Sequence, residues 1–141
     1  MKLWFDDTRP APEGYIWLKS VNQGIYFIRA FRALKNNKPF LFGEAINSLK
    51  KAGGPKLTKA DFVPLSIELI SLDHDAGSFA NKGGDYIKFL DYLVEVTYAS
   101  SQLIPTDFPV AFHTMNPVGR DNMKIVAERN GFPIKNPEYK I

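Results

Sequence analysis

The sequence contains no cysteine, which excludes disulfide bonds and metal sites built from thiolates. It also lacks any run of roughly 18 apolar residues, the length that a membrane-spanning helix needs. The opening residues, MKLWFDDTRP, do not contain the apolar segment of a secretion signal. We therefore expect a cytoplasmic protein that makes no contact with membranes.

Dense runs of one charge and low-complexity segments are absent as well. Eighteen basic and fifteen acidic residues give a formal charge of +3, but the basic residues are dispersed and form no nucleic-acid-binding tail. We expect no DNA duplex as a partner. With 45% hydrophobic residues, the 141-residue chain can bury a real core, and we predict one domain over 1–141.

Short apolar runs alternate with amphipathic segments along the chain. The runs predict strands at 2–5, 14–21 and 66–72, and a further strand within 108–117. Apolar residues at i, i+3 and i+4 predict helices over 83–101 and 117–130, the second with Asn116 as its N-cap and Gly131 at its end. This alternation is typical of an α/β domain with a mainly parallel sheet flanked by helices.

The segment between the second and third predicted strands is ambiguous. Aromatic residues in 25–34 favour a strand, whereas the spacing of its apolar residues favours a helix. The stretch 42–54 predicts a helix with one apolar face, and Gly53 is placed to end it.

Polar side chains follow three of the predicted strands at the point where each strand ends. They are Asp6 and Asp7, then Asp73, His74 and Asp75, and finally His113 and Thr114. In open parallel α/β sheets, ligands bind beyond the carboxyl ends of the strands. We therefore expect these three groups to converge on one crevice.

The acidic residues of this crevice predict a metal site. Carboxylates that lie close together repel one another unless a divalent cation such as Mg²⁺, or alternatively Mn²⁺, neutralises them. The predicted ligands are Asp6, Asp7, Asp73 and Asp75. A structural alternative stays open, in which one aspartate caps a turn and its neighbour is solvated.

The only two histidines, His74 and His113, lie in these polar turns. Imidazole titrates near neutral pH, so both are candidates for general acid or base, together with Asp73 as a catalytic residue. Metal ligation, or a hydrogen bond to a loop carbonyl, is the alternative for each histidine.

Four further residues are predicted to bind a phosphate. A helix that begins at Pro117 directs free N–H groups and a positive dipole end toward the same crevice. The side chains that we expect to assist it are Arg9, Thr114, Asn116 and Arg120. The alternative for Arg120 is an ordinary solvent-exposed helix residue.

Three blocks, FDDTRPAPEGY, ISLDHD and FHTMNPVGRDNM, together resemble the cyclic-phosphate processing receiver-like domains, a divergent branch of the response-regulator receiver fold. The resemblance implies a receiver-like (flavodoxin-like) fold. Between the second strand and the SLDHD strand the chain is longer than this fold needs, which predicts an inserted element around 24–65. In ordinary receivers, aspartates at the places of Asp6, Asp7 and Asp73 bind Mg²⁺, and the last of them accepts a phosphoryl group.

The sequence also departs from signalling receivers. His113 stands where a small hydroxyl residue is usual, and no lysine follows a fifth strand, since Lys135 does not lie in a buried strand pattern. The resemblance implies an enzyme that acts on a cyclic phosphate in a nucleotide or at an RNA end. We accordingly favour a metal-dependent phosphoesterase. A receiver-type phosphoacceptor, a non-catalytic cyclic-nucleotide binding protein and a purely structural role for the polar turns are the alternatives.

Overall fold

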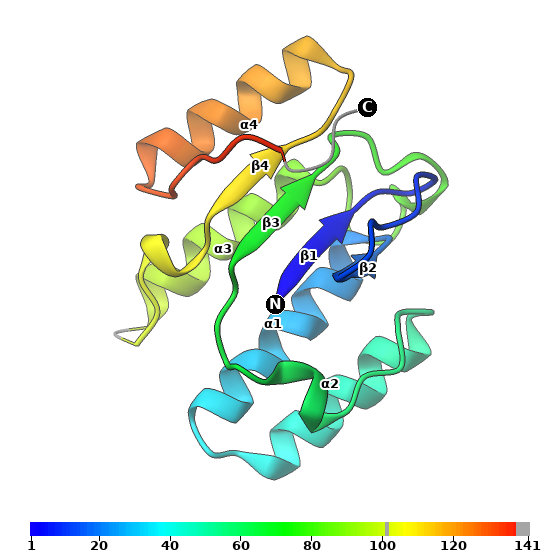
Figure 1. The fold of residues 1–141 in the computed structure, drawn as a ribbon, viewed down its shortest axis with the longest axis vertical. Helices are drawn as coiled ribbons and strands as arrows, with labels where there is room; N and C mark the ends of the chain where they lie inside the picture. Colours follow the sequence, from blue (N-terminus) through cyan, green and yellow to red (C-terminus); the bar gives the residue numbers. More distant parts are fainter. Residues whose placement is uncertain (101, 138–141) are drawn as a thin grey trace.

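A computed structural model describes residues 1–100 and 102–137 of the chain. Four strands form one parallel sheet in the order β2-β1-β3-β4 (Figure 1); they are β1 (Lys2–Phe5), β2 (Tyr15–Leu18), β3 (Leu69–Leu72) and β4 (Val110–Phe112). The flavodoxin-like arrangement begins with this strand order. The prediction of a mainly parallel α/β fold is therefore confirmed.

The helices are α1 (Val21–Lys35), α2 (Pro39–Lys51), α3 (Ile87–Ala99) and α4 (Pro117–Arg129), with short 3-10 turns η1 (Lys59–Phe62), η2 (Gly77–Phe79) and η3 (Pro105–Asp107). The ambiguous stretch 25–34 is thus helical. Among the described residues, no helix is both long enough and apolar enough to cross a membrane.

Several predicted boundaries were wrong. The strand predicted over 14–21 ends at Leu18, because the Ser20 hydroxyl accepts the Gln23 N–H (3.1 Å) and starts α1. The strand predicted from residue 66 begins at Leu69, since the Ser66 N–H bonds the Pro64 carbonyl in a turn (2.8 Å).

The helix predicted over 83–101 begins only at Ile87. Gly83 and Gly84 have φ values of +112° and +95°, which no right-handed helix contains. The helix ends at Ala99, and residue 101 lies outside the described part of the chain. The helix predicted over 42–54 starts earlier, at Pro39, and ends at Lys51 with Gly53 at φ +79° just beyond it.

One face of the sheet is covered by α1 and α3, which lie behind the strands in Figure 1. Phe5 on β1 packs against Phe89 of α3 with ring centroids 4.4 Å apart. Its ring also approaches Gly24 of α1 closely. These contacts bury the aliphatic and aromatic side chains that alternate along each strand.

The predicted insertion around 24–65 includes most of α1, and the part after α1 forms a helical layer on its outer side. In this layer α2 packs along α1, and η1 closes the gap between them (Figure 1). Phe62 of η1 stacks on Phe27 of α1 at 4.9 Å and meets the edge of Phe42 of α2 at 5.4 Å. The layer is therefore anchored by aromatic packing.

Two features of the sheet are unusual for this arrangement. The parallel strands β1 and β2 are joined by residues 6–14, which contain no helix, although parallel connections usually take a dozen or more residues. A fifth strand is reduced to one parallel bridge between Ile134 and Val110. The β1–β2 connection is therefore a loop, and beyond β4 only this single bridge extends the sheet.

The close approach of α1 to β1 gives a stability prediction. A Cβ on Gly24 would lie 2.6 Å from the Phe5 ring and 2.8 Å from the Phe89 ring, so Gly24→Ala overpacks the core. We expect a net loss of about 1–2 kcal/mol in the free energy of unfolding, measured by urea denaturation.

Gly43→Ala in α2 is the matched control, because a Cβ there would meet nothing within 4 Å. Removing the backbone entropy of a helical glycine should stabilise the protein by about 0.5–1 kcal/mol. Equal effects of the two substitutions would show that α1 does not pack on β1 as described.

Candidate functional site

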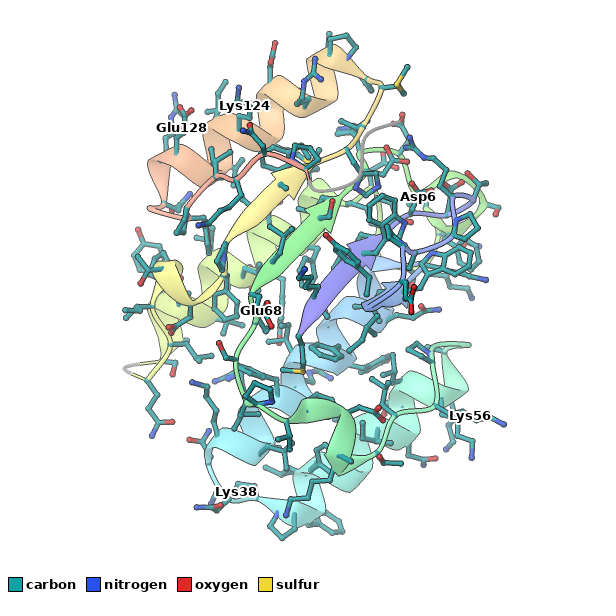
Figure 2. All side chains as sticks on the ribbon, viewed as in Figure 1. Asp6, Lys38, Lys56, Glu68, Lys124 and Glu128 are labelled. Carbon is teal, nitrogen blue, oxygen red and sulfur yellow. The ribbon has the colours of Figure 1, made fainter. Side chains whose placement is uncertain are left out.

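The side chain of Asp6 is fully buried directly after β1, where it accepts four hydrogen bonds. One carboxylate oxygen accepts the backbone N–H groups of Thr8 (3.0 Å) and Arg9 (2.9 Å). The other accepts the Arg9 Nε–H (2.8 Å) and faces His113 Nε2 (3.1 Å). Figure 2 shows Asp6 beside the carboxyl end of β1.

These contacts decide the charge of Asp6. Burial alone would raise its pKa, but the hydrogen bonds from His113, Arg9 and Thr8 and the Arg9 charge outweigh burial and lower the pKa to about 2. Asp6 is therefore a carboxylate throughout the physiological range.

The ring of His113 is buried, and it contacts the protein through one stacked face and through both of its nitrogens. It stacks on Trp4 with the two rings nearly parallel and their centroids 3.6 Å apart. Because a carboxylate only accepts, Nε2 carries the proton toward Asp6, and Nδ1 shares a hydrogen bond with the Ser71 hydroxyl (2.8 Å). Both ring nitrogens thus have partners inside the protein.

Arg9 links two of the strand ends. Its Nε pairs with Asp6 and its Nη2 with Asp73 (3.1 Å), the residue that follows β3. Asp73 also accepts its neighbour's backbone N–H, that of His74 (2.8 Å). The Arg9 side chain is 27% exposed, so it remains partly open to solvent while it pairs with both carboxylates.

Two indole groups hold the 6–14 connection in place over this site. Trp17 donates to the Asp6 carbonyl (2.8 Å), and Trp4 donates to the Arg9 carbonyl (2.9 Å). The two tryptophans are register partners on adjacent strands. The backbone on which Asp6 and Arg9 sit is therefore fixed to the sheet at two points.

Asp7 lies partly exposed beside this network. Burial is the largest influence on the carboxyl of Asp7, and with the negative charges of Asp6 and Asp73 it raises the pKa. Gly77, at φ +55°, leaves the space that the Asp7 carboxylate occupies, because a Cβ there would collide with it. The loop after β3 is thus shaped around Asp7.

The three aspartates fit a divalent cation. Asp6, Asp7 and Asp73 each offer an oxygen, and these three atoms lie within 4.8 Å of one another. Carboxylate oxygens are ligands that Mg²⁺ and Mn²⁺ prefer. Arg9 supplies one positive charge against the three negative charges of these aspartates. Their negative charge also acts on Tyr86, where it adds to the effect of burial and raises the pKa of the phenol. The three carboxylates therefore keep more negative charge than Arg9 neutralises.

Asp75 lies apart from these three residues. Its side chain is 63% exposed and pairs with His74 Nδ1 (2.8 Å). With Asp85 these two residues form a second group of possible ligands, although one Asp85 oxygen already accepts the Ala76 N–H (3.0 Å). The four predicted metal ligands are therefore divided between two places.

His74 forms an imidazole–carboxylate pair at the start of α4. Its ring lies against Gly119, where any Cβ would collide with it. Nδ1 faces Asp75, and Nε2 makes no hydrogen bond to the described part of the chain. Of the two histidines, His74 is the one that can meet a ligand.

The remaining predicted residues build the N-terminus of α4. Asn116 caps the helix by accepting the Gly119 N–H (2.9 Å), and buried Thr114 accepts the Asn116 N–H (3.1 Å). Arg120 is exposed one turn into the helix. The structure thus brings Thr114 and Asn116 to this turn as scaffolding, with Arg120 on its outer surface.

Sequence reasoning missed several residues of this site. Trp4 and Ser71 precede Asp6 and Asp73 by two positions, so the period-2 alternation of a strand places each on the same face as its aspartate. This alternation in the sequence was sufficient to identify Trp4 and Ser71 as neighbours of the two aspartates. The collisions that Gly77 and Gly119 avoid depend on segments far apart in the sequence and had no local signal.

The family model of the cyclic-phosphate processing receiver domain matches residues 56–129, just over half of the chain. The chain belongs to this family. No curated protein and no solved structure matches it. The matched range of this receiver domain includes Asp73, His74 and α4, whereas Asp6, Asp7 and Arg9 precede it and are joined to it by the contacts above.

Lys135, which follows the bridge that stands for a fifth strand, does not form the buried lysine site of a signalling receiver. Lys135 follows the single bridge at Ile134, its backbone N–H bonds the carbonyl of Val110 at the start of β4 (2.8 Å), and its side chain is exposed. Arg9 is instead the cation that pairs with Asp73.

The low pKa of Asp6 gives a prediction for stability against pH. A carboxyl whose folded pKa lies below its unfolded value stabilises the protein above the unfolded pKa, and the stabilisation is lost as pH falls through the folded pKa. A fall from 3.8 to about 2 corresponds to about 2 kcal/mol. Asp6→Asn should lower the free energy of unfolding by about this much at pH 7.

The difference should shrink as pH falls from 3.8 toward 2, because the wild type then loses the same contribution. Denaturation at several pH values measures it, with Asp121→Asn on the exposed surface of α4 as the control. A difference that stays constant with pH would mean that the charge of Asp6 is not what stabilises the fold.

Proposed function

We propose that this receiver domain is a metal-dependent phosphoesterase that opens a cyclic phosphate, in a nucleotide or at an RNA end, by hydrolysis. One observation carries the proposal: three carboxylates, a guanidinium and a carboxylate-paired imidazole meet at one edge of the sheet. Family membership supports the cyclic phosphate as the substrate.

Asp7 and Asp73 are the residues that we expect to hold Mg²⁺ or Mn²⁺, because Asp6 already accepts four hydrogen bonds. When bound, the cation supplies positive charge that neutralises the phosphoryl oxygens and favours attack on phosphorus. The need is electrostatic, since an anionic phosphate would otherwise approach an edge that carries excess negative charge.

Arg9 is positioned to bind the phosphate of the substrate. A guanidinium has five N–H donors, and its two ion pairs leave donors free to face solvent. Asp6 and Asp73 hold the group rigid, so little side-chain entropy is lost when the phosphate binds. The N-terminus of α4, with the Asn116 cap, adds a favourable dipole next to His74, whose ring lies against Gly119.

His74 serves as the general acid in this proposal. The oxygen of a water molecule forms a bond to phosphorus, one P–O ester bond of the ring breaks, and the leaving oxygen takes the proton from Nε2 of protonated His74. The proton of the water passes to solvent, and a phosphomonoester with a free hydroxyl results. Asp75 accepts from Nδ1 and stabilises the charged ring.

We assign His113 a positioning role, because both of its ring nitrogens have protein partners and its side chain is fully buried. It holds Asp6, which in turn holds Arg9. Its removal should therefore act on phosphate binding through Arg9, and the proton donor should be unaffected.

The test of activity is hydrolysis of 2′,3′-cyclic nucleotides, 3′,5′-cyclic mononucleotides and cyclic dinucleotides with Mg²⁺, with Mn²⁺ and with chelator. We expect metal-dependent turnover of at least one class, and a loss in kcat of about 10²–10⁴-fold in His74→Gln because the general acid is gone. Asp121→Asn, on the exposed surface of α4, should retain wild-type turnover.

Turnover of no substrate by the wild type would reject the enzyme. A wild-type rate in His74→Gln would reject the role of His74 while leaving the enzyme in place. Turnover that persists in chelator would reject the metal.

The metal site has a test that does not depend on activity. A cation at 100 times its Kd stabilises the folded protein by about 2.7 kcal/mol, so Mg²⁺ should raise Tm by several degrees. Asp7→Asn should abolish this rise. In chelator at pH 7, the same variant should be more stable than the wild type, because the raised pKa of Asp7 means that its ionised form is unfavourable in the folded state.

Asp75→Asn is the matched control, since Asp75 belongs to the other group of possible ligands. It should leave the response to Mg²⁺ intact. The reverse result, in which only Asp75→Asn abolishes the response, would move the cation to the group of His74, Asp75 and Asp85.

A further inference from the structure

The charges of this protein are strongly segregated. Residues 19–59, which contain α1 and α2, carry nine basic residues and only one acidic residue, Glu44. The other 100 residues carry nine basic and fourteen acidic residues. A chain with a mild net charge therefore combines a strongly basic segment, which contains α1 and α2, with a remainder that is net acidic.

The basic segment contains a groove. A cavity of about 630 Å³ lies between α1 and α2, and its basic lining residues are Arg29, Arg32 and Lys38. A second cavity of about 380 Å³, which includes Lys51 and Lys82, shares Tyr26 and Ser48 with the first. We call the two together the α1–α2 groove.

Glu44 also lines the first cavity, so the groove combines five basic side chains with one acidic side chain. None of the five basic side chains forms an ion pair with a carboxylate in the described part of the chain. Arg29 lies over the ring of Tyr26, 5.7 Å from its centroid, where the two share the wall of the first cavity. Cations that line a groove around an aromatic ring are typical of sites that bind single-stranded nucleic acid.

The groove extends toward the candidate site. Figure 2 shows Lys38 at the end of the helical layer that lies away from Asp6. The other end of the groove is formed by Ser20 at the start of α1 and by Lys82, whose carbonyl accepts the Asn22 N–H (3.1 Å). Lys82 is on the loop that begins at the site, and Gly77 on this loop contacts Asp7.

Gly77 and Lys82 are five positions apart in the chain, so their Cα atoms are at most about 18 Å apart. A flexible strand of a few nucleotides can cover such a distance. A mononucleotide held at Arg9 and Asp7 would leave the groove empty.

We infer that the α1–α2 groove binds the body of a single-stranded RNA whose cyclic-phosphate end occupies the site at Arg9 and His74. This inference rests on the proposed function, in which the site opens the cyclic phosphate at the end of the strand. It specifies in addition that the substrate is an oligonucleotide. The groove contributes affinity through the phosphates of the strand, and Tyr26 lines both of its cavities.

The test measures binding of a labelled 12-nucleotide single-stranded RNA that ends in a 2′,3′-cyclic phosphate, by fluorescence anisotropy over a salt series. Each phosphate contact to a single strand adds about 0.7 to the slope of log K against log salt concentration. Arg29→Gln/Arg32→Gln should reduce the slope by about 1.4 and weaken binding roughly 20-fold at about 0.1 M salt.

The matched control is Lys124→Gln/Arg129→Gln, which removes the same charge from α4, where Figure 2 shows Lys124 distant from Lys38. It should leave the affinity and the slope close to the wild-type values. Both double variants should hydrolyse a 2′,3′-cyclic mononucleotide at the wild-type rate, because neither touches the site.

The outcomes separate the two proposals. Equal losses of RNA affinity in both double variants, or no loss in either, would overturn the groove, whatever the mononucleotide assay shows. Selective loss in the Arg29/Arg32 variant would support the groove even if no substrate were hydrolysed, and the proposed hydrolysis would then fail alone.

Discussion

The carboxylate of Asp6 is the interaction on which the rest of the site depends. It is a buried charge, so it is tolerated only because four donors surround it, and removing one donor would leave a costly unmatched charge. Those donors come from the connection after β1 and from the end of β4. A single carboxylate therefore fixes Arg9, the imidazole of His113 and the ends of two strands that are not neighbours in the sheet.

Much of the fold and of the site location could be predicted from local patterns. Short apolar runs that end in aspartate or histidine gave the strands, and the parallel arrangement then placed Asp6, Asp73 and His113 at one edge. The pairings could not be predicted, because the contact of Asp6 with His113 joins residues 107 positions apart. Sequence patterns likewise could not distinguish a buried imidazole from one that faces solvent.

The same limit explains two other differences. The stretch 25–34 was ambiguous because its aromatic residues favour strands, yet they became helical by packing against η1, as Phe27 does on Phe62. The basic residues seemed dispersed in the sequence, but residues three apart, such as Arg29 and Arg32, lie on one face of a helix. Folding thus gathers into one layer a charge that the linear sequence spreads out.

The anchoring of the 6–14 connection by Trp4 and Trp17 has a practical consequence. These are the only tryptophans in the chain, and each donates its indole N–H to a backbone carbonyl of a site residue, Asp6 or Arg9. Their intrinsic fluorescence is therefore a built-in optical reporter of the site scaffold, with Trp4 also in contact with the His113 ring. We expect binding at the site to change this fluorescence, so that occupancy can be followed in the unlabelled protein.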